Sequence, residues 1–289
     1  MKVLVTGATG FVGKRLVRKL VSLGHKVSIL TRDTESAQKR LPLICAFHRW
    51  EPDLYPPSSQ AFTGVDAVVH LAGENIAGGR WTKERKKSIK DSRVLSTKNL
   101  VSTLQSMVNP PSIFISSSAV GFYGKDKPVE LYENLEPGKD FLANVCKEWE
   151  HEAFAAKKSN IRTIALRIGI VLGYEGGAMK KMLPPFWVGA GGNLGHGNQW
   201  MSWIHVNDLV GMIIHSLENK EIEGVYNATS PEPVTNKEFT KCLAKTLRRP
   251  ALIPVPRFAL KLILGEMSDL LLGSLKVSSL KIVDSGYKF

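Results

Sequence analysis

Long apolar runs, paired cysteines and low-complexity stretches are all missing from this sequence of 289 residues. A helix that crosses a bilayer needs about 18–20 consecutive apolar residues. No run approaches that length, so a membrane-spanning protein is not expected. The three cysteines, Cys45, Cys146 and Cys242, are widely spaced and form no CxxC pair. Neither a disulfide framework nor a zinc knuckle is therefore expected, and the pattern fits a reducing compartment.

Acidic residues are also few, with 26 Asp and Glu against 39 Lys and Arg, a net charge of +13. The hydrophobic fraction of 43% and the charged fraction of 22% are those of an ordinary globular protein. This composition excludes a disordered or collagen-like chain. The charge taken alone would indicate nucleic acid, an acidic membrane surface or an anionic ligand as partner.

The first residues, Met1–Thr6, already have the pattern of a buried strand. A secretory signal would need an apolar core here, and a transit peptide a longer leader poor in acidic residues. We therefore expect a cytoplasmic protein, and an organellar matrix is also compatible with the sequence.

Strand patterns alternate with helical patterns along most of the chain. Strands are expected over Met1–Thr6, Lys26–Leu30, Cys45–Trp50, Asp66–Ala72, Ser112–Ser117, Thr163–Ile168 and Gly224–Ala228, and helices over 14–23, 83–107 and 141–156. Such alternation predicts the α/β class, with a doubly wound parallel sheet of the Rossmann type.

The alternation weakens after about residue 170, and prolines punctuate the last 55 residues or so. We expect residues 1–170 to form a Rossmann domain. Residues 171–289 are expected to form a small, mostly helical lobe on the substrate side, interleaved with the last strands and extended at the C-terminus from about residue 235. The glycine-rich stretch 189–199 is too long for a simple connector and is a candidate functional loop.

Three glycines, Gly7, Gly10 and Gly13, stand between the first strand and the first helix. In this context the first glycine permits a tight turn, the second lets backbone N–H groups approach a pyrophosphate, and the third lets the helix pack closely on the sheet. Glycine-rich strand–helix turns also occur for packing alone. The flanking strand and helix favour a dinucleotide site, with the phosphates at the helix N-terminus.

The end of the second strand distinguishes NAD from NADP. An acidic residue there binds the ribose 2′-hydroxyl of NAD, whereas an arginine accommodates the 2′-phosphate of NADP. Arg32 is the first charged residue after the strand and can hold a phosphate with two hydrogen bonds. Asp33 follows it and could cap a turn or contact a ribose. The sequence favours NADP(H).

Five segments in order resemble the extended short-chain dehydrogenases/reductases, and more closely their atypical "epimerase family" branch. They are TGATGFVG (6–13), DAVVHLAGENI (66–76), ISSSAVGFYG (115–124), LRIGIVLG (166–173) and SWIHVNDL (202–209). The resemblance covers residues 2 to about 210, and the C-terminal lobe looks like the extension of that branch. It implies a Rossmann fold that binds NADP(H) as its cofactor.

The resemblance, together with the glycine loop, gives a set of candidate site residues. The candidate cofactor-binding residues are Gly7, Thr9, Gly10, Phe11, Val12, Gly13, Arg32, Leu71, Ala72, Gly73, Glu74, Ser116 and Arg167. Ser118 matches the family's catalytic serine, and Tyr123 is a weaker catalytic candidate. No metal site is expected, because the seven histidines are scattered and no HExxH motif occurs.

The tyrosine and lysine that active relatives carry four residues apart on a helix are missing. Ala143 stands four residues before Lys147, and the alternative alignment places Leu142 and Cys146 at the two positions. In the family the tyrosine is the general acid/base, and the nearby ammonium lowers its pKa. The absence leaves the proton donor unassigned.

Two further charged features have open interpretations. Arg167 interrupts an apolar strand, so it needs an anionic partner, which is either a ligand in the cleft or a carboxylate of a structural ion pair. The segment Arg80–Lys98 holds eight basic residues against two acidic ones, a net +6. A solvated basic face accounts for it, and one or two of its residues could contact phosphate. Nucleic-acid binding is not expected without an accompanying motif.

Two functions from different classes follow. The first is an NADP(H)-dependent oxidoreductase or epimerase that acts on an unidentified small molecule. The second is a catalytically impaired NADP(H)-sensing or interaction protein. The sequence leaves the oligomeric state open, and a homo-oligomer is compatible with it.

Overall fold

A seven-stranded sheet forms the centre of the computed structural model, which describes residues 1–42 and 45–289. Its strands run in the spatial order β3-β2-β1-β4-β5-β7-β11, and every neighbouring pair is parallel. The strands are β1 (Lys2–Thr6), β2 (Lys26–Thr31), β3 (Cys45–Arg49), β4 (Ala67–His70), β5 (Ile113–Ala119), β7 (Arg162–Ile168) and β11 (Gly224–Ala228). This order confirms the predicted doubly wound sheet of the Rossmann type.

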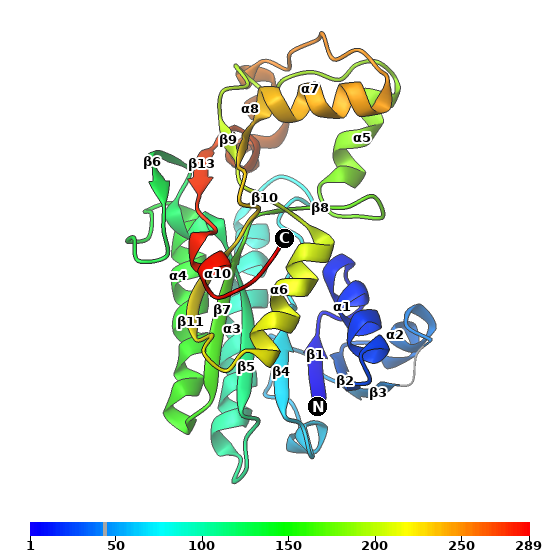
Figure 1. Cartoon of the computed structure of the whole chain (residues 1–289), viewed down its shortest axis with the longest axis vertical. Coiled ribbons are helices and arrows are strands. Elements are labelled where there is room, and N and C mark those ends of the chain that lie inside the picture. The colour runs from blue at the N-terminus through cyan, green and yellow to red at the C-terminus, as the bar shows by residue number, and fades with distance from the viewer. Residues whose placement is uncertain (43–44) are drawn as a thin grey trace.

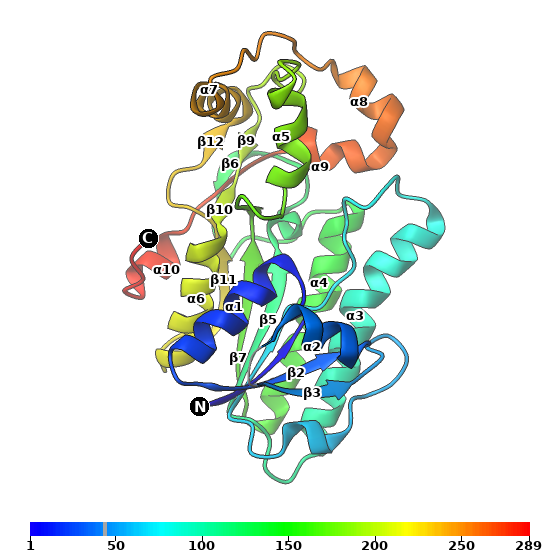
Figure 2. The same cartoon turned by 90° about the vertical axis from the view of Figure 1, so that its right-hand side faces the viewer.

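Helices cover both faces of the sheet (Figures 1 and 2). One face packs against α1 (Phe11–Ser22), α6 (Val206–Glu218) and α10 (Leu280–Asp284), and the other against α3 (Lys83–Ser106) and α4 (Phe141–Phe154). Strand β1 shows why: Val3 and Val5 belong to the first core, and Leu4 between them belongs to the second. Because both faces are buried, the inner strands β1, β2 and β4 are mainly apolar runs, as parallel strands usually are.

The largest differences from the predicted strand ends fall at the carboxyl edge of the sheet. Strand β4 ends at His70, because the N–H groups of Leu71 and Ala72 donate to the hydroxyl of Thr6, at 3.2 and 3.1 Å. Strand β5 continues to Ala119, so Ser118 is a strand residue. Helix α4 ends at Phe154 and continues as the 3-10 helix η3 (Ala155–Ser159).

A smaller, mostly helical lobe lies over the carboxyl ends of the strands (Figure 2). Its helices are α5 (Met179–Trp187), α7 (Asn236–Leu247), α8 (Arg257–Leu264), the 3-10 helix η4 (Gly265–Ser268) and α9 (Asp269–Leu272). Three two-stranded pairings join it to the main sheet region: β8 (Ile170–Leu172) with β10 (Trp203–His205), β9 (Trp200–Met201) with β12 (Val234–Thr235), and β6 (Asp126–Leu131) with β13 (Ser274–Val277).

The last residues of the chain leave this lobe and return to the main domain. Ile282 of α10 is buried in the core on the α1 and α6 side, and Tyr287 packs against that core and donates a hydrogen bond from its hydroxyl to the carbonyl of Asp208, at 3.0 Å. The C-terminal region is therefore helical as expected, but two of its elements lie outside the lobe's helices. Helix α10 packs on the main sheet, and strand β13 pairs with β6. No helix in the described part of the chain is long and apolar enough to cross a membrane.

The remaining elements are short. Helix α2 (Thr34–Arg40) follows β2, and the 3-10 helices η1 (Ser59–Phe62) and η2 (Val120–Tyr123) precede β4 and follow β5. Helix η2 matters for the site, because it carries Gly121 and Tyr123 to the carboxyl edge of the sheet.

Candidate functional site

The turn between β1 and α1 requires glycine at two of the three predicted positions. Gly7 has a φ of +67°, and a Cβ atom there would lie 2.6 Å from the carbonyl oxygen of Leu71. A Cβ at Gly13 would lie 2.3 Å from the carbonyl oxygen of Gly7. Both contacts are far shorter than van der Waals distance, so the chain here packs backbone against backbone.

The first turn of α1 is open to an anion. Gly10 is its N-cap residue and makes no side-chain cap, and the first turn holds no acidic residue. The N–H groups at the start of a helix have no partner within the helix, and the helix dipole adds positive potential there. A dinucleotide phosphate fits these donors and the glycine-lined turn beneath them. Thr9, Phe11 and Val12 line the same turn and are partly buried.

Phe11 fixes this helix start to the loop between β8 and α5. Its ring lies so close to Gly173, Gly176 and Gly177 that a Cβ atom on any of them would come within 2.6–2.9 Å of a ring atom. One turn further along, Arg15 forms an ion pair with Glu175 at 3.1 Å. The loop between β8 and α5 thus packs directly against the start of α1.

A chain of neutral hydrogen bonds holds the next loop, at the end of β4. The Thr6 hydroxyl, which accepts the N–H groups of Leu71 and Ala72, lies 2.7 Å from Nδ1 of His70. The other ring nitrogen of His70 lies 3.3 Å from the Ser96 hydroxyl on α3. Burial lowers the pKa of His70 to about 3. The imidazole is therefore neutral and serves as a fixed link between β1, β4 and α3.

Helix α3 also holds the residues that follow. The Glu74 N–H donates to the Ser92 hydroxyl at 3.0 Å, and the Glu74 carboxylate pairs with Arg85 at 2.7 Å. Leu71 and Ala72 therefore lie beside the glycine turn, and Gly73 and Glu74 lie beside α3, at the edge where doubly wound folds bind ligands. Their contact with the cofactor stays a prediction.

Arg32 and Asp33 have different surroundings at the end of β2. The Asp33 carboxylate caps α2 by accepting the Ser36 N–H at 2.9 Å. The Arg32 side chain is exposed and forms no ion pair with any residue that the structure describes. Asp33 thus has the capping role that the sequence left open, and Arg32 is available to an anion.

Ser118 is part of a buried charged network behind the next strand ends. Its hydroxyl donates to Glu150 at 2.6 Å, and Glu150 accepts two hydrogen bonds from Arg167, both at 2.9 Å. Arg167 also donates to the Tyr123 hydroxyl at 3.0 Å, and Tyr123 donates to Asn227 at 2.7 Å. These residues are 0–6% exposed. The arrangement matches the ion pair that the sequence gave as one interpretation of Arg167.

This network restricts what its members can do chemically. The proton of Ser118 points to Glu150, so the hydroxyl meets a ligand as an acceptor. Burial raises the pKa of Tyr123, whose hydroxyl is already held by Arg167 and Asn227. Tyr123 is thus not poised to exchange a proton with a ligand, and its catalytic role stays a prediction, as does cofactor contact by Arg167.

Leu142 and Cys146, which one of the two alignments puts at the family's tyrosine and lysine positions, lie beside Gly121. A Cβ atom at Gly121 would lie 3.4 Å from Cβ of Leu142 and 4.0 Å from Sγ of Cys146. Burial and the neighbouring Glu150 raise the pKa of Cys146 to about 12, so the thiol stays protonated. Lys147 is exposed. Ser116 is fully buried, and its hydroxyl donates to the carbonyl of Ser117 at 3.0 Å.

Sequence reasoning missed Thr6, His70, Glu150 and Asn227. One signal was available, since His70 and Glu150 are ionisable residues in apolar surroundings, which require a partner when buried. No cluster of metal-ligating side chains occurs within residues 1–42 and 45–289.

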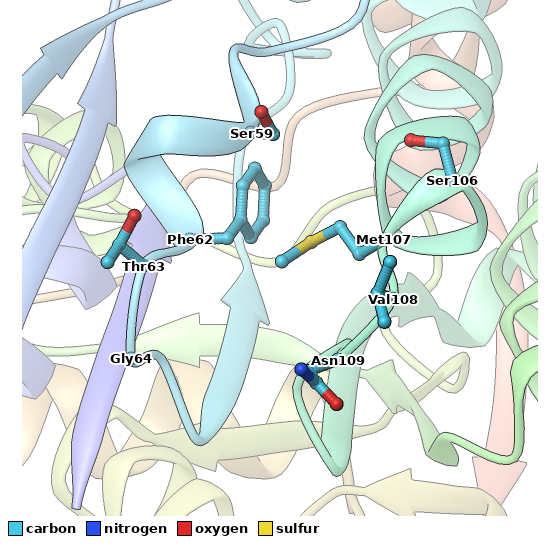
Figure 3. Close-up of a pocket in the computed structure, with 8 residues that line it drawn as sticks. All are labelled: Ser59, Phe62, Thr63, Gly64, Ser106, Met107, Val108 and Asn109. Carbon is cyan, nitrogen blue, oxygen red and sulfur yellow. The ribbon is translucent and has the colours of Figure 1, made fainter.

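A surface pocket of about 460 Å³ lies away from all these residues (Figure 3). It is formed by Ser59, Phe62, Thr63, Gly64, Ser106, Met107, Val108 and Asn109, and the side chains of Phe62 and Met107 point toward one another. These residues precede β4 and β5, so the pocket lies at the amino edge of the sheet. Ligands of doubly wound folds bind at the opposite edge.

Comparisons with known families and proteins agree with this geometry. The NAD dependent epimerase/dehydratase family matches residues 3–229, and DUF1731, a domain of unknown function, matches residues 255–289. "Epimerase family protein SDR39U1 homolog, chloroplastic" from Arabidopsis thaliana is 41% identical over 298 residues, covering 100% of this chain and 83% of the relative. Epimerase family protein YfhF from Bacillus subtilis is 37% identical over 291 residues, covering 100% and 94%.

Solved structures also match this chain over its whole length. Human epimerase family protein SDR39U1 (isoform2), crystallised with NADPH, has a TM-score of 0.87 and 33% identity, over 100% of this chain and 95% of that chain. A UDP-glucuronic acid 4-epimerase from Bacillus cereus, in complex with UDP-glucuronic acid and NAD, has a TM-score of 0.80 and 21% identity, which shows a shared fold alone. The chain therefore belongs to the NAD dependent epimerase/dehydratase family, among its SDR39U1-like epimerase family proteins.

Proposed function

We propose that this chain binds NADP(H) along the carboxyl edge of its sheet and uses it in a redox or epimerase-type reaction on a small molecule. The observation that carries the proposal is the start of α1, where uncapped N–H groups stand over a glycine-lined turn. The SDR39U1 structure with NADPH supports the same cofactor.

The halves of the cofactor have different neighbours in this proposal. Arg32, beyond β2, binds the 2′-phosphate of the adenosine half. The nicotinamide half extends across β1 to the ends of β4 and β5, beside Gly73 and Ser118. Residues 1–170 then form the cofactor domain, and the lobe within residues 171–289 covers the substrate.

NADPH supplies or accepts a hydride when it is bound, and the chain's own residues position the partner. Ser118 accepts a hydrogen bond from a substrate hydroxyl, because its own proton is directed to Glu150. The site therefore suits an alcohol or a hydrated carbonyl better than a bare ketone, which needs a donor.

The test has two stages. NADPH binding is measured first, by the change in nicotinamide fluorescence on titration with protein. NADPH oxidation and NADP⁺ reduction are then followed over a panel of carbonyls and alcohols, with Ser118→Ala beside the wild type. Turnover that Ser118→Ala loses supports the proposal, and binding without turnover across the panel contradicts its catalytic part.

The second candidate is an NADP(H)-sensing protein without turnover. The alignment that puts Leu142 and Cys146 at the two catalytic positions favours it, since neither side chain exchanges protons near neutral pH. It requires a partner whose affinity differs between the NADPH-bound and cofactor-free forms. Pull-downs with and without NADPH that recover the same proteins in the same amounts contradict it.

We place the protein in a reducing compartment, the cytoplasm or an organellar matrix. The cysteines Cys45, Cys146 and Cys242 are all unpaired in the described part of the chain.

A further inference from the structure

Lys147 is exposed and the alternative alignment puts Cys146 at the lysine position, so α4 brings no cation to the site. A guanidinium from another helix lies next to Cys146. Arg93 projects from α3 toward the loop after β4, and a Cβ atom at Gly73 would lie 3.4 Å from its Cζ. On the side of α4, the centroid of the Trp149 ring is 5.4 Å away. The positive charge of Arg93 acts on the Cys146 thiol, where it opposes the larger effect of burial on the pKa. Arg93 thus lies between the cofactor loop and the lysine position.

The hydrogen bonds of Arg93 are all to neutral acceptors. It donates to the carbonyls of Ile89 and Glu74, at 3.1 and 3.0 Å, and to the Ser92 hydroxyl at 3.4 Å. No carboxylate of the described residues lies within ion-pair distance of it, because the Glu74 carboxylate pairs with Arg85. Its Nε–H and one N–H of Nη2 have no acceptor among the described residues.

The other arginines near the ends of β4 and β5 differ in this respect, whereas Arg32 lies beyond β2. Arg85 is paired with Glu74, and Arg167 with Glu150. Burial is the main effect that lowers the pKa of Arg93, but an arginine remains protonated at any physiological pH. Arg93 therefore keeps a full positive charge in a partly buried position and forms no ion pair with any described residue.

Building on the proposed function, we propose that Arg93 is the positioning cation of the nicotinamide end of the site, in place of the lysine that relatives carry on the helix equivalent to α4. Its free N–H groups bind a hydroxyl oxygen of the nicotinamide ribose, and its charge acts on the nicotinamide ring. The positive charge then comes from α3, so the site stays cationic although α4 presents Cys146 there and keeps Lys147 exposed.

A charge-based consequence follows. The nicotinamide ring is positively charged when oxidised and neutral when reduced, so a nearby cation weakens binding of NADP⁺ relative to NADPH. A merely structural role, in which Arg93 holds the Glu74 carbonyl, would affect both forms equally.

The test compares the affinities for NADPH, NADP⁺ and adenosine 2′,5′-bisphosphate, which lacks the nicotinamide half, by calorimetry on the full chain. Arg93→Gln removes the charge and keeps an amide donor for the Glu74 carbonyl, Arg93→Lys keeps the charge, and Lys147→Met on the exposed side of α4 is the control. We expect Arg93→Gln to lower the preference for NADPH over NADP⁺ by roughly five- to tenfold. Arg93→Lys and Lys147→Met should retain the preference, and the bisphosphate should bind all four proteins equally.

Three outcomes overturn the inference. An unchanged NADPH to NADP⁺ ratio in Arg93→Gln shows that the charge does not act on the ring. A parallel loss of bisphosphate binding shows that the loop has collapsed and that the role is structural. If Arg93→Gln fails to fold, loss of the ratio in folded Arg93→Lys shows that charge at this position is not the determinant. Failure of the wild type to bind NADPH contradicts the proposed function itself, whereas normal binding with an unchanged ratio contradicts Arg93 alone.

Discussion

Two regions at the same edge of the sheet are built by different means. The glycine turn and the β4 loop form their surface from backbone groups, held by neutral bonds among Thr6, His70 and Ser96. The β5 and α4 region forms its interior from charged side chains, with Glu150 and Arg167 at the centre. The first region keeps the family's pattern, and the second has lost the tyrosine and lysine.

A site built from backbone groups and a site built from side chains tolerate substitutions differently. A backbone surface depends on a few positions where no side chain fits, and Gly7 and Gly13 are such positions. A side-chain site depends on the identity of every member. Once the tyrosine and lysine are absent, the remaining polar residues satisfy one another, as Ser118 and Glu150 do.

The largest effect is expected from breaking the charged network. Glu150→Gln leaves Arg167 buried without a counter-charge, so we expect a loss of about 3–5 kcal/mol of unfolding free energy, measured by urea denaturation. Glu148→Gln is the matched control, because its pair with Lys90 is about half exposed and contributes about 0–1 kcal/mol. Equal losses in the two variants would show that the network is not a stabilising unit.

The backbone region is tested by a pair of glycines with nearly the same positive φ. Gly7 and Gly64 have φ values of +67° and +65°, but a Cβ at Gly64 has no atom within 4 Å. Gly64→Ala should cost about 1 kcal/mol through strain alone. Gly7→Ala should cost about 2–4 kcal/mol, since the collision with Leu71 adds to the strain, and should abolish NADPH binding. Unimpaired NADPH binding by Gly7→Ala would contradict the close-packed turn.

The neutral network predicts a pH dependence of stability. The folded-state pKa of His70 is about 3, whereas an unfolded histidine titrates near 6.5. Below pH 6.5 the unfolded chain therefore binds a proton that the folded chain refuses, and stability falls by up to about 1.4 kcal/mol per pH unit toward pH 3. Denaturation midpoints at pH 7, 6 and 5 measure this fall. His70→Gln should lose this component, and the exposed His151→Gln should keep it; a His70→Gln profile parallel to wild type would refute the assignment.

The smallest effect concerns cofactor choice at the end of β2. Arg32→Ala should weaken NADPH binding about tenfold or more and leave NADH binding nearly unchanged, because only NADPH carries the 2′-phosphate. Fluorescence titration with both cofactors gives the two ratios. Equal weakening of both would show that Arg32 contacts a group common to the two cofactors.

The main sheet was predictable because its inner strands are mainly apolar runs, and the glycine turn because its spacing carries its geometry. Helix α5 was not, since Pro184 and Pro185 lie inside it and prolines usually end helices. Strand β6 was missed for another reason. Its partner β13 is 146 residues away in the sequence where Lys276 faces Glu130, and no local pattern signals such a pairing.

The sequence by itself determined the sheet, the turn that presents α1 to an anion and the loss of the tyrosine–lysine pair. These are local properties. Apolar periodicity sets the sheet, the glycine positions set the turn, and the four-residue spacing on one helix shows whether the pair is present. The tertiary structure alone decided which charges are neutralised. Glu150 forms an ion pair with Arg167, and Glu74 forms one with Arg85. Arg93, beside Cys146, donates only to neutral acceptors. That outcome depends on how α3 and α4 pack on the sheet, because ion pairs form between side chains that meet in space.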